Sequence, residues 1–331
     1  QILHVFREEL DINTQDVHTM LRKEILLLTY QAEKNIRPTI DYLKESTIGT
    51  SLILVPSTPK ERQIIDLDVD IDIYDNHTKE QLLKHRLKKL VMGHPKILSS
   101  SILKNLQPTV EFFLTYVRMT NSEFGRVLYR RGGSILEANL DRTLRRKVDF
   151  LRNALGLQVF GDSFQNEEEA FIPIPSPSLN ETEENRISDY QKQRLLAQML
   201  AINPDILTLS IEANLEPKLR YFQEHLHVST PQLRHIILKR PQLLSLSLER
   251  NLKPKIDFLL SSDEKGMGVT REKLRDWLVS SPSSLTTVLD KRIKPRIREL
   301  QRCGLYVTHP DVPYNFLTLT ESSWCKWLQQ Q

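Results

Sequence analysis

Residues 240–259 read RPQLLSLSLERNLKPKIDFL, and this stretch decides the fold. Two prolines stand thirteen residues apart, with apolar residues at fixed places around both. With φ for an apolar residue, the full motif is φ-x2-φ-φ-x3-P-x2-L-x7-(L/I)-x-P-x-φ-x2-φ. Four gap-free copies occur, at Pro95/Pro108, Pro204/Pro217, Pro241/Pro254 and Pro282/Pro295. A long motif that recurs along a chain predicts stacked helical repeats rather than a pocket enzyme.

Two further copies are weaker. The copy that starts at Val17 has Ile25 at the first proline position, and the copy around Gly133 lacks both prolines and has Arg146 at the second position. We number the repeats 1 to 6 by their first proline positions, which are residues 25, 95, 133, 204, 241 and 282. The second proline positions are 38, 108, 146, 217, 254 and 295. The chain therefore predicts an all-α fold, a solenoid of about six repeats.

Each repeat is predicted to contain two helices joined by a tight turn. After the second proline, Leu252, Ile256 and Leu259 follow one another at the spacing of a single helix face. A second helix precedes the first proline, which ends it. The residues between the prolines are too few for a long helix and predict a turn or a 3₁₀ segment. We expect an asparagine three residues before the second proline to cap the second helix, at Asn35, Asn105, Asn214 and Asn251.

Two acidic insertions interrupt the repeats. We predict a repeat array over 13–303, an acidic insertion at 46–80, an acidic Pro-rich insertion at 161–190 and a C-terminal cap at 304–331. Within the first insertion, residues 65–73 alternate apolar residues with aspartate, which suits either a strand or a mobile acidic loop; we favour the loop, because a single strand has no sheet to join.

Charge is unevenly distributed along the chain. The formal net charge is +4, but residues 61–80 carry −5 and residues 161–190 carry −7. The remainder, which bears the repeats, therefore carries +16. A basic array with acidic insertions predicts a polyanionic partner.

Basic residues are concentrated beside the second proline position. Eight of the twelve flanking sites are basic: Arg37, Arg145, Lys147, Lys218, Lys253, Lys255, Lys294 and Arg296. A cation beside the free N–H groups of a helix start suits a phosphate. These residues are our candidate nucleic-acid site, and a solvated basic face is the alternative. Arg130, Arg131, Lys239 and Arg240, just ahead of the first proline position, are candidates for the same surface.

Other chemistry has little support in the sequence. No apolar run approaches the roughly 18 residues of a membrane span. Two cysteines exclude a disulfide framework and a cysteine-based zinc site. The aspartates of residues 66–72 lack the glycine of a calcium loop, and no phosphate-binding glycine loop occurs. We therefore expect no enzyme activity, no metal and no cofactor.

The double-proline motif followed by an amphipathic helix resembles the repeat of the mitochondrial transcription termination factor (mTERF) family, over about residues 17–300. The resemblance implies a left-handed superhelix of three-helix units that binds organellar nucleic acid, in mitochondria or chloroplasts, and acts in transcription termination or initiation, ribosome biogenesis or intron splicing. Because the sequence begins at Gln1 rather than Met, we expect a processed form or a fragment, with any transit peptide outside it.

The functional prediction is a helical-repeat protein that binds double-stranded DNA as a monomer and regulates transcription in an organelle. No membrane partner is expected. Binding of structured RNA, such as ribosomal RNA or an intron, is the nearest alternative, and a protein-interaction scaffold is the second. The sequence does not separate DNA from RNA, or mitochondrion from plastid.

Overall fold

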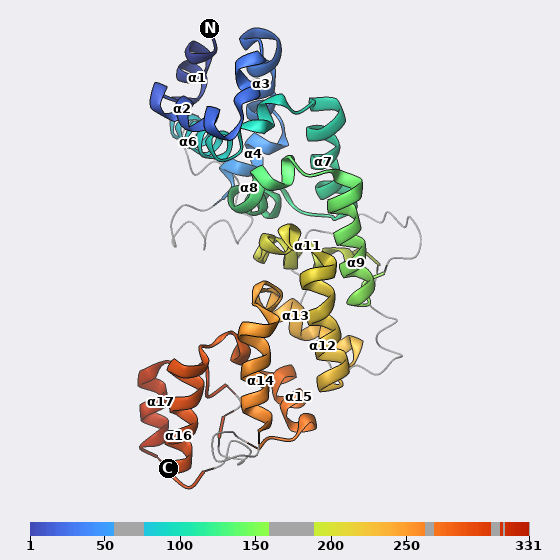
Figure 1. Cartoon of the computed structure of the whole chain (residues 1–331), viewed down its shortest axis with the longest axis vertical. Coiled ribbons are helices and arrows are strands. Elements are labelled where there is room, and N and C mark those ends of the chain that lie inside the picture. The colour runs from blue at the N-terminus through green and yellow to red at the C-terminus, as the bar shows by residue number, and fades with distance from the viewer. Residues whose placement is uncertain (56–75, 159–188, 262–267, 306–311, 314, 331) are drawn as a thin grey trace. The chain divides into compact units, whose positions relative to one another are not determined.

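The computed structural model of the chain describes residues 1–55, 76–158, 189–261, 268–305, 312–313 and 315–330 (Figure 1). Every regular element within these residues is helical, which confirms the all-α prediction. They divide into two compact units, and the boundary falls inside α9 (Arg146–Ala154). The loop expected at 65–73 and nearly all of the insertion at 161–190 lie outside the described residues.

Unit 1 comprises the described residues up to 150 together with 189–208. It holds repeats 1 and 2, repeat 3 as far as Phe150, and the first half of repeat 4. Its elements, where η marks a 3₁₀ or π turn, are α1 (Ile2–Leu10), α2 (Thr14–Lys23), η1 (Ile25–Thr29), η2 (Ala32–Ile36), α3 (Arg37–Glu45), α4 (Thr47–Ile53), α6 (Asn76–Gly93), η4 (Pro95–Ser99), η5 (Ile102–Leu106), α7 (Gln107–Glu111), η6 (Phe112–Tyr116), α8 (Asn121–Leu136), η7 (Leu140–Arg145), α11 (Asp189–Ile202) and η8 (Pro204–Thr208).

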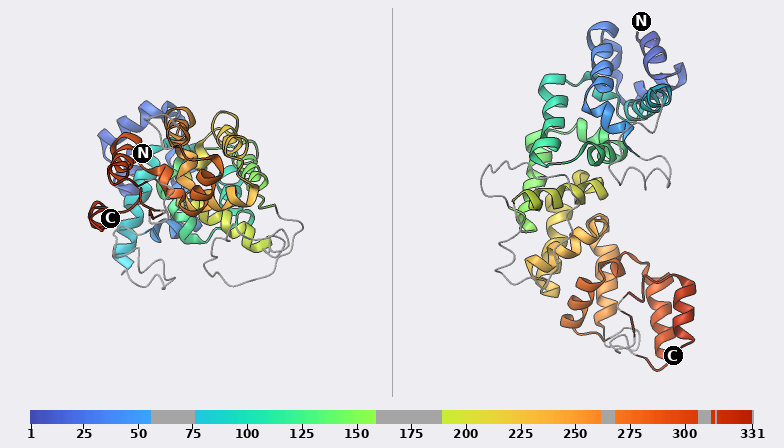
Figure 2. Two further views of the ribbon diagram at one scale, coloured as in Figure 1. Left: turned by 90° about the horizontal axis from the view of Figure 1, so that it is seen from below. Right: turned by 180° about the vertical axis from the view of Figure 1, so that it is seen from behind.

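Unit 2 comprises residues 151–158 and the described residues from 209 onward. Its elements are η9 (Ile211–Leu215), α12 (Glu216–Leu226), α13 (Thr230–Lys239), η10 (Pro241–Ser245), η11 (Leu248–Leu252), α14 (Lys253–Leu260), α15 (Arg271–Ser280), η12 (Pro282–Thr286), η13 (Leu289–Ile293), α16 (Lys294–Arg302) and α17 (Glu321–Leu328). The second helices of its repeats, α12, α14 and α16, follow one another across the unit (Figures 1 and 2). Within this unit the stacked-repeat prediction is visible directly.

The first half of each repeat is a helix that stops at the first proline. In repeat 5, Ser229 caps α13 with a capping box, and Pro241 then opens the 3₁₀ turn η10. Proline suits the first turn of such an element, where its missing N–H costs nothing. The 3₁₀ segment predicted between the prolines is therefore confirmed.

The second helix begins earlier than predicted. In repeat 5 its cap is Ser247, whose hydroxyl accepts a hydrogen bond from the Arg250 N–H, and a π turn leads into α14. Asn251 lies inside that turn, as Asn35, Asn105 and Asn214 lie inside theirs. The asparagine caps we expected are therefore wrong. The helix starts four residues, or about one turn, before the predicted cap. A wide turn before the second proline avoids the clash of the proline ring with the preceding carbonyls.

The core consists of the apolar positions of the motif. The residue two before the second proline position is almost fully buried in all six repeats: Ile36, Leu106, Leu144, Leu215, Leu252 and Ile293. The residues two and five after that position are buried as well, for example Ile256 and Leu259. Each repeat thus buries one apolar stripe of its second helix. Burial of apolar surface is the dominant favourable contribution to folding stability.

Repeat 1 departs from the predicted core. Ile25 and Leu28 are 70% and 64% exposed, whereas their counterparts in repeat 2, Pro95 and Leu98, are buried. In repeat 2 this turn is η4, which contacts η1, η2 and α3 of repeat 1. The positions are therefore buried by the preceding repeat, so the motif alone does not predict their burial.

Repeat 3 shows what loss of the first proline does. Helix α8 runs on through Gly133 to Leu136 instead of stopping. At this point it passes so close to His94 that a Cβ atom on Gly133 would lie 1.9 Å from His94 Cδ2. Glycine replaces proline here because the helix continues and has no room for a side chain.

The region predicted as the first acidic insertion is partly helical. Its described residues contain α4 and the start of α6. Helix α4 packs closely against α8, where a Cβ on Gly125 would lie 2.0 Å from the Ser51 carbonyl oxygen. The inserted sequence therefore contributes a core helix.

The C-terminal segment forms half of a further repeat. Pro313 and Phe316 keep the spacing of the first proline and the leucine three residues later. The Phe316 ring stacks on Trp277 and lies tilted against the fully buried Trp324 of α17, with a centroid distance of 5.8 Å to each. This half-repeat covers repeat 6 in the way that each repeat covers its predecessor.

Candidate nucleic-acid interface

The predicted cations that follow the second proline are buried. They are Lys147, Lys218, Lys255 and Arg296, and all are less than 10% exposed. The equivalent residues of repeats 1 and 2, Thr39 and Thr109, are buried too. Their place inside the array leaves these four side chains unavailable to a phosphate on the surface, so they are no part of the interface we propose below.

Each of these buried cations bridges to the following repeat. Lys218 Nζ donates to the Leu244 carbonyl oxygen at 2.6 Å, and Lys255 Nζ donates to the Leu285 carbonyl oxygen at 2.7 Å. Lys147 donates in the same way to Leu207, and Arg296 donates to Phe316. All four acceptors stand three residues after the first proline position of the next repeat.

Burial without a carboxylate partner is costly for an ammonium group. It lowers the pKa of Lys218, and it lowers the pKa of Lys255 to about 8. The two lysines are retained because they satisfy carbonyl groups that the next repeat would otherwise bury unpaired. Their role is to join neighbouring repeats.

The predicted cations that precede the second proline are half-buried and paired. Each faces an acid four residues earlier: Glu33 for Arg37, Asp141 for Arg145, Glu249 for Lys253 and Asp290 for Lys294. The distances include 3.0 Å for Arg37 Nε to Glu33 Oε2 and 2.5 Å for Lys294 Nζ to Asp290 Oδ1. Ion pairs at this level of exposure contribute little to stability, so these cations retain some capacity to bind an external anion.

An aromatic row accompanies these cations. The residue four after the second proline position is aromatic in repeats 1 to 5: Tyr42, Phe112, Phe150, Tyr221 and Phe258. The Arg145 guanidinium lies 5.2 Å from the centroid of the Phe112 ring in the preceding repeat, and Lys253 Nζ lies 5.8 Å from that of Tyr221. These contacts are cation–π interactions across repeat boundaries. We did not predict this row, although its fixed position in the motif is visible in the sequence.

The cations ahead of the first proline position divide into two groups. Arg130 donates to the Ile202 carbonyl oxygen at 3.1 Å, and Arg131 pairs with Asp205 at 2.7 Å, both in the next repeat. The hydrogen bond from Arg131 lowers the pKa of the Asp205 carboxyl. Lys239 and Arg240 are exposed, and their side chains have no hydrogen bond or ion pair within the described residues.

A second set of cations, absent from our prediction, is fully at the surface. The residue four before the second proline position is basic in five of the six repeats. We call these residues the basic row: Lys34, Lys104, Arg142, Arg250 and Lys291. All five are exposed, and none of their side chains forms a hydrogen bond or ion pair with another described residue.

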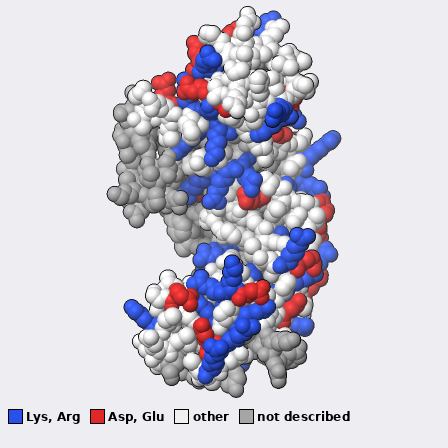
Figure 3. Space-filling model, turned by 60° about the vertical axis from the view of Figure 1, so that its left-hand side comes forward, with Lys and Arg blue, Asp and Glu red and all other residues white. Residues whose placement is uncertain are grey.

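Neighbouring acids explain why the basic row is left unpaired. An acid directly precedes Lys34, Arg142, Arg250 and Lys291, but in each case it is engaged by the cation just before the second proline. Repeat 4 interrupts the row with Ala213, and it also has Glu216 in place of that cation. Figure 3 shows Lys and Arg side chains grouped on the face it presents, with Asp and Glu among them.

Comparison with known proteins identifies the repeat. The mTERF family model matches residues 1–159 and 191–320, which is most of the chain. The gap between the two matches falls on the second acidic insertion. None of the curated proteins compared with the chain is a match. Among the described residues, no helix is long and apolar enough to cross a membrane. With its six helical repeats and this match, the chain is a member of the mTERF family.

Proposed function

We propose that this protein binds double-stranded DNA in an organelle, through phosphate contacts of the basic row, and thereby regulates transcription. Family membership supports the broader statement, an organellar nucleic-acid-binding role related to transcription in a family of helical-repeat proteins that are not known enzymes. The basic row is the observation that carries the proposal: one exposed, unpaired cation recurs at one position in five repeats. A polyphosphate is the partner that such recurring cations suit.

Exposed cations without an internal acid partner are the best phosphate ligands available on this surface. Binding a phosphate then breaks no existing ion pair and requires no buried group to move. The paired cations before the second proline form a second tier, since a phosphate would have to compete there with a neighbouring carboxylate. Lys239 and Arg240 add two unpaired cations in repeat 5.

The test is a salt titration of duplex DNA binding by fluorescence anisotropy. With about six phosphate contacts, log K should fall with log salt concentration at a slope near −5. Replacing all five basic-row residues by Gln should weaken binding at least tenfold at about 100 mM salt.

The matched control removes five exposed, unpaired cations elsewhere, so both variants have the same net charge: Arg7, Arg22, Lys273, Arg302 and Lys326. We expect a much smaller loss for the control. Equal affinities of the two folded variants would contradict the basic row as the interface.

Competition between duplex DNA and duplex RNA of equal length then decides the ligand, and a preference for RNA would replace DNA in the proposal.

A further inference from the structure

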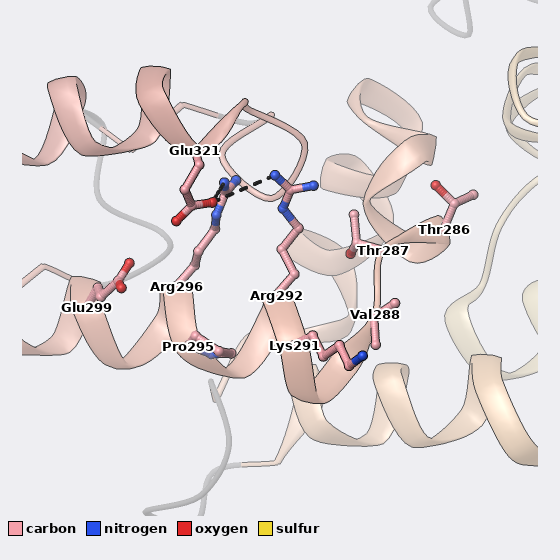
Figure 4. Close-up of a pocket in the computed structure, with 9 residues that line it drawn as sticks. All are labelled: Thr286, Thr287, Val288, Lys291, Arg292, Pro295, Arg296, Glu299 and Glu321. Carbon is pink, nitrogen blue, oxygen red and sulfur yellow. Dashed lines mark hydrogen bonds and ion pairs between the residues drawn. The ribbon is translucent and has the colours of Figure 1, made fainter.

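A pocket of about 560 Å³ lies between repeat 6 and α17 (Figure 4). Its wall carries three cations, Lys291 of the basic row, Arg292 and Arg296, and two carboxylates, those of Glu299 and Glu321. The Glu299 carboxylate accepts a hydrogen bond from the Trp324 indole N–H. Figure 4 shows both arginines and Glu321 pointing toward one another, with Lys291 on the same helix. Helix α17 lies beyond residue 320, where the family match ends. The pocket therefore combines a repeat with a segment outside that match.

Glu321 is an exposed anion placed between two arginines. Its Oε2 atom lies 3.0 Å from Arg296 Nη2 and 3.9 Å from Arg292 Nη2, yet the side chain is 72% exposed. Arg296 is also held by the carbonyl oxygens of Phe316 and Leu319, and Arg292 Nη2 donates to the Leu319 carbonyl oxygen at 2.9 Å. Both arginines thus keep their positions without Glu321.

We propose that this pocket binds a phosphate group and that the Glu321 carboxylate occupies its place when no ligand is bound. The ligand phosphate contacts Arg292 and Lys291, whose ammonium group has no partner among the described residues. The planar guanidinium of Arg292 and the ammonium group of Lys291 supply the positive charge and the hydrogen-bond donors that a phosphate needs. The proposal rests on the proposed function when the phosphate belongs to nucleic acid; a small phosphate compound is the other source.

The experiment is a double-mutant cycle between Arg292 and Glu321 on duplex DNA affinity. Glu321→Gln removes the competing anion and should tighten binding about two- to fivefold, the range of an exposed ion pair. Arg292→Gln should weaken binding, and Glu321→Gln should give no gain in the Arg292→Gln background. Glu224→Gln is the control, because the Glu224 side chain is 73% exposed, lies 3.8 Å from Arg220 Nε and is outside the pocket.

A second arm measures thermal stabilisation by inorganic phosphate alone. A stabilisation that Glu321→Gln increases and Arg292→Gln abolishes, without any change in duplex affinity, assigns the pocket to a small phosphate compound. If Glu321→Gln changes neither duplex affinity nor the response to phosphate, the inference is overturned. Trp324 and Phe316 hold α17 in place in this variant, so its melting temperature should stay within about 2 °C of the wild type.

The two proposals fail separately. If the five-site variant loses tight binding but Glu321→Gln changes neither duplex affinity nor the response to phosphate, the basic row is supported and the pocket proposal is rejected. A wild-type chain that binds no nucleic acid removes the basic row, while the phosphate arm still tests the pocket.

Discussion

The ammonium group of Lys218 donates a 2.6 Å hydrogen bond to the carbonyl oxygen of Leu244 in the following repeat. The same bond joins Lys255 to Leu285 and Lys147 to Leu207. A repeat protein gains much of its stability from interfaces between neighbours. These lysines supply each such interface with a polar contact of fixed direction, which sets the stacking of one repeat on the next more strictly than apolar contacts do.

Replacing Lys218 by Met should lower the free energy of unfolding by about 1–3 kcal/mol, because the Leu244 carbonyl is then buried without its donor. Urea unfolding followed by circular dichroism measures the change. Arg220→Gln, on the same helix but exposed and paired only with Glu216 and Glu224, should cost less than about 0.5 kcal/mol. Equal losses of unfolding free energy for the two substitutions would show that the buried hydrogen bond contributes no more to stability than the surface ion pairs.

Lys255 should make stability rise with pH. Its pKa is about 8 in the folded chain, against the ordinary lysine value of 10.5 in the unfolded chain. Between these two pH values the unfolded chain therefore binds more protons than the folded chain. The free energy of unfolding should therefore increase from pH 8 to 10.5, by up to about 3 kcal/mol, and this gain is absent below pH 8. The observable is the difference between wild type and Lys255→Met across that range, which cancels other titrating groups. A pH-independent difference would be inconsistent with a depressed pKa.

Gly133→Ala should destabilise unit 1 by about 1–3 kcal/mol, since its Cβ would collide with the His94 ring. Gly93→Ala is the control, because nothing lies within 4 Å of a Cβ at that position in α6. It should be neutral or slightly stabilising, as alanine favours a helix over glycine. Thermal unfolding of both variants gives the comparison; a stable Gly133→Ala chain would mean that His94 moves aside at little cost.

The sequence predicted the fold well because the motif encodes burial directly. Positions such as Leu252, Ile256 and Leu259 are apolar for one reason, the shared core, and they are buried as expected. Ile25 shows the limit of this inference. Burial at this motif position depends on contact with a neighbouring repeat rather than on the residue's own helix. The spacing alone therefore predicts that Ile25 is buried, whereas it is exposed.

The candidate site was predicted less well, because a cation's residue type does not reveal its direction. Lys253 and Lys255 are two residues apart on one helix, which turns their side chains to different faces. One pairs with Glu249 at the surface, and the other enters the interface with the next repeat. Our prediction covered only the two sites adjacent to the second proline, and the basic row lies outside them. One further turn toward the N-terminus, the same alignment contains Arg250 and its counterparts.

Salt dependence should separate the surface cations from the buried ones. Arg250→Gln removes one phosphate contact and should reduce the slope of log K against log salt by about 0.9. Lys218→Met removes a charge that lies 3% exposed and is hydrogen-bonded to a carbonyl, so its slope should equal that of the wild type at a temperature where the variant is folded. Fluorescence anisotropy over about 50–300 mM salt measures both slopes. A lower slope for Lys218→Met, with an unchanged slope for Arg250→Gln, would show that the phosphates contact the cations after the second proline instead of the basic row. Because counterion release depends only on cations that reach a phosphate, the slopes identify the binding face independently of stability.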